Sequence, residues 1–301
     1  MKIAILSKGA ANYTTKRLKE EAIKRGHEVR VVNYVKCYVT VEKNNPVVRY
    51  KGRVLEGFDA IIPRIAQSYT RYATAIVRQF EMQGVFTTAT SIAINRSRDK
   101  LRSYQLLAKY GVAVPKTVFA RETADFDDVI ELAGGTPLII KVARGTHGNG
   151  VVLAETPKAA KAVMQAFYVE GVNFLVQEFV KESAGSDFRA LVVGNKVVAS
   201  IMRQSLDEDF RSNTHQGGIG KPVKLTDEER HAAIKAAKAM GLQVCAVDML
   251  RSEKGPLVIE VNSSGSIKTP ELMTDRNVAE KIIEYVELNA KRTHKKDRVG
   301  A

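Results

Sequence analysis

The sequence predicts an α/β fold, because strand and helix signals alternate through its first third. In residues 1–95, short apolar runs typical of buried strands are separated by two helical stretches, which are closed by Gly26 and Gly84. The strands are expected at 2–6, 28–34 and 59–66, and the helices at 15–25 and 72–82. Alternation of this kind is typical of βαβ units around a mostly parallel sheet. The length of 301 residues allows two or three domains, since typical domains contain about 100–150 residues.

The composition excludes several classes of protein. With 45% hydrophobic and 27% charged residues, the chain has the make-up of a soluble globular protein, and no apolar run reaches the ~18 residues of a membrane span. The cysteines, Cys37 and Cys245, suit a reducing cytoplasm better than a disulfide framework. The first strand is not followed by the GxGxxG fingerprint of dinucleotide binding. We therefore expect a cytoplasmic protein that has no membrane partner and is not an ordinary dinucleotide enzyme.

The charge of the chain favours acidic partners. Its 47 basic and 33 acidic residues give a net charge of +14. Such an excess favours nucleotides, carboxylate substrates or a polyanionic surface such as the ribosome. Several of the basic residues stand in the C-terminal tail, at 291–298. Because no nucleic-acid module or interleaved aromatic pattern accompanies them, specific nucleic-acid recognition is not expected.

A glycine-containing loop stands between two apolar strands in the stretch 137–155. The loop carries Gly145, Gly148 and Gly150, and glycines let backbone amides approach an anion closely, as in loops that cover phosphates. It lacks the GxxxxGK[ST] signature of a Walker A loop. Lys141 lies in the apolar run before it, where a lysine is costly to bury unless it faces a cleft or meets an anion. Snorkelling of this lysine at a strand edge is the alternative.

The remaining elements alternate helices with hairpins. Residues 91–111 are predicted to form one long helix, which ends at a glycine. A hairpin is predicted over 187–204, followed by a polar loop at 208–223. A helix with a capping-box start is expected at 226–240, and a final helix at 277–290.

The stretch Val244–Asn262 is a second predicted hairpin, and each of its two apolar runs contains a carboxylate. Glu260 and Asn262 point to the same face, because successive side chains of a strand alternate. If the turn is centred on Lys254, Asp248 lies directly opposite Glu260. Asp248, Glu260 and Asn262 are then expected to converge on one small volume.

Two carboxylates and an amide oxygen form a hard-oxygen ligand set, which suits Mg²⁺ or Mn²⁺. Like charges that face each other across two strands repel unless a cation lies between them. The alternative is that Asp248, Glu260 and Asn262 are exposed polar positions on a half-solvated hairpin.

These pieces, in their order and spacing, resemble the ATP-grasp superfamily. Within it they resemble the RimK-type ligases, which add glutamate to the C-terminus of a small-subunit ribosomal protein. The resemblance covers almost the whole chain and is carried by these stretches: MKIAILS, YKGRVLEGFDAIIPRI, RDKLRSYQLLAKYG, PLIIKVARGTHGNGVVLAET, VQEFVKE, DFRALVVGNKVVA, DFRSNTHQGG and VDMLRSEKGPLVIEVN.

The resemblance implies an ATP-grasp fold of mixed α/β and α+β type, in which two α+β subdomains sandwich ATP. The implied domains are a Rossmann-like pre-ATP-grasp domain at 1–95, a lid subdomain at 96–182 and a C-terminal subdomain with the metal site and the basic tail at 183–301.

The resemblance also implies a role for each matching residue. Lys100 and Lys141 look like the lysines that hold the nucleotide phosphates, and Gly145, Gly148 and Gly150 look like the loop over the triphosphate. The residues implied to bind the rest of the nucleotide are Glu178, Phe179 and Val180 at the adenine, Asp187 near the ribose, and Arg211, Ser212 and Asn213. Arg203 and Arg211 match the catalytic arginines, and Asp248, Glu260 and Asn262 match the ligands of Mg²⁺ or Mn²⁺, with two ions expected.

The implied reaction has two steps. A carboxylate attacks the γ-phosphate of ATP to give an acylphosphate, and the amine of L-glutamate then displaces phosphate to form an amide. The C-terminus of the ribosomal protein is the implied acceptor, and a homo-oligomer stays open. Two other functions also stay open: a related ligase that makes poly-glutamate or another small peptide amide, and a nucleotide-binding, ribosome-associated regulator without ligase activity.

The sequence departs from the family just after Asn262. The family usually continues with a small residue, proline and glycine, whereas this chain has Ser263, Ser264 and Gly265, and its next proline is Pro270. The corresponding loop lies near the substrate in the family. The departure therefore bears on the choice of acceptor and amino acid more than on the use of ATP.

Overall fold

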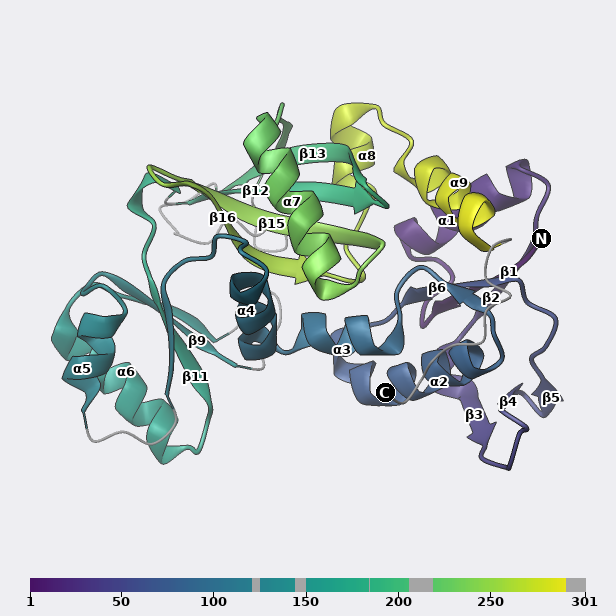
Figure 1. Cartoon of the computed structure of the whole chain (residues 1–301), viewed down its shortest axis with the longest axis horizontal. Helices are drawn as coiled ribbons and strands as arrows, with labels where there is room; N and C mark the ends of the chain where they lie inside the picture. Colours follow the sequence, from purple (N-terminus) through teal and green to yellow (C-terminus); the bar gives the residue numbers. More distant parts are fainter. Residues whose placement is uncertain (121–124, 144–149, 184, 206–218, 291–301) are drawn as a thin grey trace.

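The N-terminal part of the chain is built around a parallel sheet. The computed structural model describes residues 1–120, 125–143, 150–183, 185–205 and 219–290. The sheet has the order β2-β1-β6-β7, and all its strand pairs are parallel, as predicted. Its strands are β1 (Lys2–Ser7), β2 (Glu28–Val32), β6 (Ala60–Arg64) and β7 (Phe86–Thr87). Helices α1 (Tyr13–Lys24) and α2 (Thr70–Met82) pack against it, with the short 3₁₀ helix η2 (Gln67–Tyr69) before α2 (Figure 1).

A small antiparallel sheet at the edge of this part was not predicted. It follows the 3₁₀ helix η1 (Tyr34–Lys36) and consists of β3 (Cys37–Thr40), β4 (Val47–Tyr50) and β5 (Arg53–Val54). Strands of two to four residues that carry charged side chains give no clear period-2 pattern, which explains why the sequence did not predict them.

The region 91–111 forms two helices, so the prediction of one helix is wrong. α3 (Ser91–Arg98) and α4 (Lys100–Lys109) meet at Asp99, whose backbone is extended (φ −99°, ψ 105°). The Asp99 side chain accepts a hydrogen bond from the backbone N–H of Arg102 and thereby caps α4. Aspartate is a favoured N-cap residue, because its carboxylate satisfies an amide that the first turn leaves unpaired. The break places Arg98 and Lys100 at the junction of the two helices.

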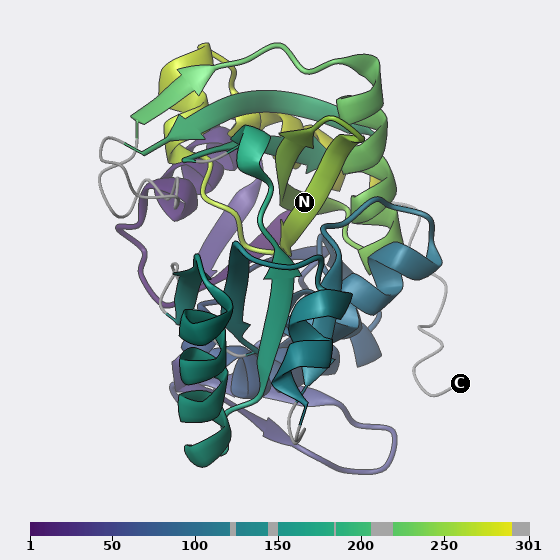
Figure 2. The same ribbon diagram turned by 90° about the vertical axis from the view of Figure 1, so that its left-hand side faces the viewer.

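The central part forms a separate four-stranded sheet, which lies apart from the other sheets in Figure 1 and is hereafter called the lid sheet. Its order is β10-β9-β11-β8, with strands β8 (Thr117–Ala120), β9 (Leu138–Val142), β10 (Val151–Ala154) and β11 (Phe174–Glu178). Helices α5 (Phe126–Leu132) and α6 (Pro157–Val169) cover one face and share a buried core with the strands (Figure 2). The predicted pair of strands around the glycine-containing loop is confirmed as β9 and β10.

The C-terminal part forms a five-stranded antiparallel sheet with the order β14-β13-β12-β15-β16. After the 3₁₀ helix η3 (Lys181–Ser183), its strands are β12 (Ser186–Val193), β13 (Lys196–Gln204), β14 (Ile219–Pro222), β15 (Val244–Ser252) and β16 (Gly255–Asn262). Its helices are α7 (Asp227–Met240), α8 (Lys268–Thr274) and α9 (Val278–Ala290). Both predicted hairpins are confirmed, and so is the capping box in which Thr226 and Glu229 bond reciprocally at the start of α7.

The N-terminal and C-terminal sheets are joined by common hydrophobic cores. One buried cluster contains Leu6 and Ile61 of the parallel sheet together with Val247 and Val261 of the C-terminal sheet. The lid sheet has its own cluster. The domain boundaries predicted near residues 95 and 182 stay a prediction. Among the described helices, none is both long enough and apolar enough to cross a membrane.

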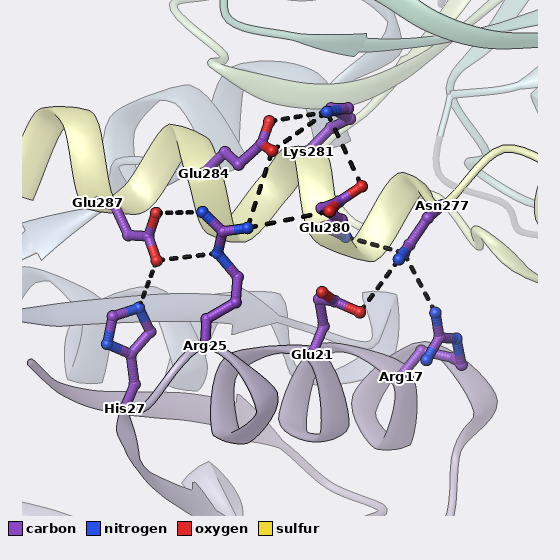
Figure 3. A network of polar contacts seen from close by, with 9 residues as sticks. All are labelled: Arg17, Glu21, Arg25, His27, Asn277, Glu280, Lys281, Glu284 and Glu287. Atoms are coloured by element: carbon purple, nitrogen blue, oxygen red, sulfur yellow. Dashed lines mark hydrogen bonds and ion pairs between the residues drawn. The ribbon is translucent and has the colours of Figure 1, made fainter.

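Ion pairs fasten the last helix to the N-terminal part (Figure 3). Arg25, at the end of α1, donates from Nε and Nη2 to the two carboxylate oxygens of Glu287 on α9, at 2.9 and 2.7 Å. His27 Nε2 lies 2.7 Å from Glu287 Oε1, and Arg25 Nη1 lies 3.9 Å from Glu280 and 3.8 Å from Glu284. A bidentate arginine–carboxylate pair within a network is more favourable than an isolated surface pair.

This network predicts a stability contribution that acid removes. Hydrogen bonds from Arg25 lower the pKa of Glu287 to about 2. A carboxylate with a lowered pKa in the folded chain stabilises the fold above its unfolded pKa of about 4.3 and loses this effect as the pH falls towards the folded value. We expect Glu287→Gln to be less stable than the wild type at pH 7, and the difference in urea midpoint to shrink between pH 4.5 and pH 2. A difference that stays constant over this range would contradict the assignment.

Candidate active site

The hairpin β15–β16 places Asp248 opposite Glu260, as predicted, but its turn is not where the prediction assumed. The tight turn lies between the paired residues Ser252 and Gly255, so an unbroken ladder would set Asp248 opposite Ile259. A shift in register between Asp248 and Met249 leaves Ile259 as an extra residue and restores the predicted pair. Such a shift is a β-bulge, which re-aims the side chains beyond it.

Helix α4 supports the bulge. The Tyr104 hydroxyl donates to the carbonyl oxygen of the extra residue, Ile259, at 2.9 Å. Burial raises the pKa of Tyr104 to about 12, so this hydroxyl keeps its proton at neutral pH. The orientation of Glu260 therefore depends on a side chain that stands far from it in the sequence.

The two opposed carboxylates have different surroundings. Asp248 is buried, with 2% of its surface exposed, whereas Glu260 is exposed. Arg189 donates from Nε and Nη2 to the two oxygens of Asp248, both at 2.7 Å, and Arg203 Nη2 lies 3.1 Å from Asp248 Oδ2. Burial alone would raise the pKa of Asp248, but the two guanidinium groups outweigh it and lower the pKa. Asp248 is therefore ionised in the folded chain.

Asp248 belongs to a chain of four alternating charges. Arg203 also donates to Asp187, from Nε to Oδ1 at 2.6 Å and from Nη2 to Oδ2. The strand registers bring these groups together, because Asp187 pairs with Arg203 and Arg189 pairs with Asp248. Two acids and two bases compensate one another, which is the usual condition for burying charge.

Asp187 and Arg203, which were predicted to have separate roles, contact each other directly. Asp187 was predicted to lie near the ribose and Arg203 to act in catalysis; the structure brings them into direct contact. These roles stay predictions. Arg189 was missed by the sequence analysis, although it stands two residues after Asp187 on the same strand and so faces the same side.

The predicted metal ligands fit a divalent cation. Asn262 donates from Nδ2 to Asp248 Oδ2 at 3.4 Å, which leaves its amide oxygen available. Asp248 Oδ1 accepts one hydrogen bond, from Arg189, and a carboxylate oxygen has two acceptor sites. Glu260 makes no hydrogen bond or ion pair with any described residue. Among the described residues no group of three His, Cys, Asp or Glu could hold a metal alone, so the set requires the oxygen of Asn262.

Two lysines complete the charge pattern beside Glu260. Lys141 donates from Nζ to Gln177 Oε1 at 2.6 Å and lies on β9, an interior strand of the lid sheet. Burial lowers the pKa of Lys141 to about 8, and the charge of Glu260 opposes this shift. The pKa of Lys100 is lowered overall. Burial and the charge of Lys141 lower it, and the charge of Glu260 partly offsets this shift. Both lysines therefore lie within electrostatic reach of the same carboxylate.

The other predicted nucleotide contacts lie around the end of β11. Glu178 Oε1 accepts from the backbone N–H of Lys116 at 2.7 Å, and the Glu178 N–H donates to the Lys116 carbonyl at 3.0 Å. Phe179 is half-buried and Val180 is buried. Glu178 thus ties β11 to the segment that leads into β8. The adenine role of these three residues stays a prediction.

Part of the predicted site lies outside the described residues. This is the case for Gly145, Gly148, Arg211, Ser212 and Asn213.

The last glycine of the phosphate-loop prediction, Gly150, is described. It has a positive φ of 74°, and a Cβ there would lie 2.5 Å from a methyl group of Val142, so this position requires glycine.

The segment after Asn262 is anchored on the N-terminal part. Arg64 Nη2 donates to the carbonyl oxygens of Ser264 and Gly265, at 3.0 and 2.7 Å. The Ile65 N–H donates to Ser264 Oγ at 3.1 Å. Gly265 packs so closely on Ala246 that a Cβ would lie 2.4 Å from the Ala246 methyl group. The segment 263–265 therefore has a defined structure next to the predicted metal ligands.

Comparisons with known proteins agree with this architecture. A family model described as the RimK-like ATP-grasp domain matches residues 97–286, and one described as the RimK PreATP-grasp domain matches residues 1–94. A protein of Hydrogenovibrio crunogenus named probable alpha-L-glutamate ligase is 55% identical over 298 residues, which are 99% of each chain. A protein of Cellvibrio japonicus with the same name is 53% identical over 291 residues, 97% of each chain.

A solved structure shows the same fold. The ATP-grasp ligase PsnB, complexed with a phosphomimetic variant of its minimal precursor, Mg and ADP, matches with a TM-score of 0.72 at 16% identity, over 95% of this chain and 97% of that chain. The predicted ATP-grasp fold and the predicted enzyme class, an ATP-grasp carboxylate–amine ligase, are confirmed. With both family models matched and close relatives along nearly its full length, the chain belongs to the RimK-like ATP-grasp family.

Proposed function

We propose that this chain is an ATP- and Mg²⁺-dependent ligase that joins L-glutamate to the C-terminus of a small-subunit ribosomal protein through an acylphosphate. The single observation that carries the proposal is the opposed pair Asp248 and Glu260, with Asn262 beside it and Lys100 and Lys141 within electrostatic reach. Cations that face an oxygen ligand set suit a triphosphate bound with its metal. The names of the relatives support glutamate as substrate, and the Mg and ADP in PsnB support the cofactor and the nucleotide.

The chemistry needs an activated acyl group, because a carboxylate is a poor acyl donor. An oxygen of the acceptor carboxylate attacks the γ-phosphorus, the bond to the β,γ-bridging oxygen breaks, and ADP leaves. The amine of glutamate then attacks the acyl carbon, phosphate leaves with the former carboxylate oxygen, and the amine loses a proton. When bound, Mg²⁺ would offset the charge that develops on the phosphates. Asp248, Glu260 and Asn262 would hold it.

Arg203 would orient the transferred phosphate. Its Nε and Nη2 bond to Asp187 and Asp248, and its Nη1 has no partner among the described residues. Because both carboxylates fix the guanidinium plane, Nη1 keeps one direction. A preorganised donor of this kind stabilises charge that develops in a transition state. Arg211 is proposed as the second arginine.

A second candidate is a related ligase that makes poly-glutamate or another peptide amide. The segment 263–265 supports this second candidate. It lies next to the predicted metal ligands, and its sequence differs from the expected family pattern. The count of two ions, the use of Mn²⁺ and a cytoplasmic location belong to the proposal as well.

One incubation separates these functions. The protein is combined with ATP, MgCl₂, glutamate and the ribosomal protein, and ADP is followed together with the intact mass of the ribosomal protein. Glutamate added to the ribosomal protein supports the main proposal. ADP without a change of that mass, but with new glutamate peptides, supports the second candidate. The absence of both ADP and product, with ATP still bound, would indicate a nucleotide-binding regulator.

A further inference from the structure

A polar pocket lies next to Glu260, on the side of the N-terminal part. It is bordered by the 3₁₀ helix η2, the junction of α3 and α4, and the bulge in β16. Gln67, Arg98 and Lys100 line it together with Tyr104 and Glu260. The pocket therefore adjoins the proposed phosphate site, and its lining residues come from elements other than the lid sheet.

Arg98 lines this pocket, and none of the described residues gives it a direct carboxylate partner. Its Nη2 donates to the Ile65 carbonyl at 2.8 Å and its Nη1 to Gln67 Oε1 at 3.4 Å. Its Nε is buried and makes no hydrogen bond to any described residue. Burial lowers the pKa of Arg98, and the nearby charge of Glu260 opposes this. Arg98 is thus a largely buried cation whose described direct contacts are all to uncharged groups.

A second guanidinium increases the local positive charge. Arg64 contacts two carbonyl oxygens of the segment at 263–265, and its pKa is lowered to about 10 by burial and by Arg98. Neither Arg64 nor Arg98 forms an ion pair with a described residue, in contrast to Arg189 and Arg203, which each pair with Asp248. Buried charge is costly unless it is paired. A bound anion would therefore compensate the positive charge of Arg64 and Arg98.

The residue type indicates which anion fits. The planar fork of arginine matches the two oxygens of a carboxylate as well as those of a phosphate, and the phosphates of ATP already have the metal site and the two lysines as proposed partners. Lys141 lies on the lid sheet, whereas Arg98 is held by Ile65 and Gln67 of the N-terminal part. The reacting carboxylate of the acceptor has to meet the γ-phosphate beside Asp248. A carboxylate at Arg98 would therefore be one that does not react.

We propose that this pocket binds the side-chain carboxylate of the incoming amino acid and that Arg98 determines the preference for a dicarboxylic amino acid over its amide. The proposal rests on the proposed function, because it assigns a subsite to the same reaction. Glutamate fits, since its amine would be free to attack while the far carboxylate is held. Glutamine would leave the Arg98 charge without an anion.

The test compares Arg98→Gln and Arg98→Lys with a control, Arg96→Gln. Arg96 lies on the same helix and also has a buried Nε that bonds to no described residue, but it does not line the pocket. We expect Arg98→Gln to raise the KM for glutamate about 10- to 100-fold, as for the loss of a charge-assisted hydrogen bond, and to reduce the preference for glutamate over glutamine. The KM for ATP should change less than about twofold, and Arg98→Lys should retain part of the affinity. Arg96→Gln should leave the KM for glutamate, the KM for ATP and the preference for glutamate over glutamine unchanged.

Other outcomes would overturn the proposal. A rise in the KM for ATP with an unchanged KM for glutamate would assign the pocket to the nucleotide. Equal losses in Arg98→Gln and Arg96→Gln would indicate a structural role. Calorimetric binding of glutamate and glutamine to the wild type, with MgCl₂ and a non-hydrolysable ATP analogue, gives a separate readout. If the wild type binds both equally, the subsite is wrong even where ligation occurs; if it prefers glutamate but ligates nothing, the proposed function fails and the subsite stands.

Discussion

Glu260→Gln is expected to lower turnover about 10³-fold and to leave the free energy of unfolding unchanged. The substitution keeps the size of the side chain but removes the anionic ligand, and stabilisation of transferred phosphate charge by a bound metal contributes several kcal/mol. Glu260 is exposed and makes no described hydrogen bond or ion pair. Surface substitutions of this kind usually change stability by less than about 0.5 kcal/mol. Steady-state release of ADP and urea denaturation measure the two effects.

Glu253→Gln is the matched control for Glu260→Gln. Glu253 is an exposed glutamate in the turn of the same hairpin, and its replacement should change neither turnover nor stability. If Glu260→Gln keeps wild-type activity, the assignment of the metal site is wrong.

Asp248→Asn is expected to remove turnover and also to destabilise the fold by about 3–5 kcal/mol, the effect of removing one partner of a buried ion pair. The same hairpin therefore holds one carboxylate that serves the reaction alone and one that also stabilises the protein. Asp248→Asn is expected to lower stability because Asp248 pairs with Arg189 and Arg203. Urea denaturation at pH 7 checks the loss.

A double-mutant cycle identifies the partner of Asp248. If Arg189→Gln is combined with Asp248→Asn, the double variant should lose less stability than the sum of the single variants, because the first change already removes the bidentate pair. Additive losses, or an Asp248→Asn variant as stable as the wild type, would contradict the charge network.

The sequence predicted the facing carboxylates, although one feature of the hairpin was hidden. Alternation along the strands correctly placed Asp248, Glu260 and Asn262 on one face. The assumed turn at Lys254 gave the correct pair because the bulge at Ile259 compensates for a tighter turn. This bulge depends on Tyr104, which is 155 residues away, and no local pattern reports such a contact.

Other features were missed for related reasons. The break at Asp99 had a local sign, an N-cap residue, but the helical pattern around it was continuous. The pairing of Arg189 with Asp248 follows from strand register, which depends on the whole sheet. That no described carboxylate pairs directly with Arg98 follows only from the placement of its described neighbours, which come from distant parts of the sequence.

The transfer of oxygen tests the central claim most directly, namely that the protein activates a carboxylate by phosphorylation at this site. A peptide that ends in the C-terminal sequence of the acceptor is labelled with ¹⁸O in its terminal carboxylate and incubated with the protein, ATP, MgCl₂ and glutamate. The acylphosphate route carries one labelled oxygen into each released phosphate. Phosphate that contains one ¹⁸O for each amide formed is the predicted result, and unlabelled phosphate alongside the amide product would contradict the account.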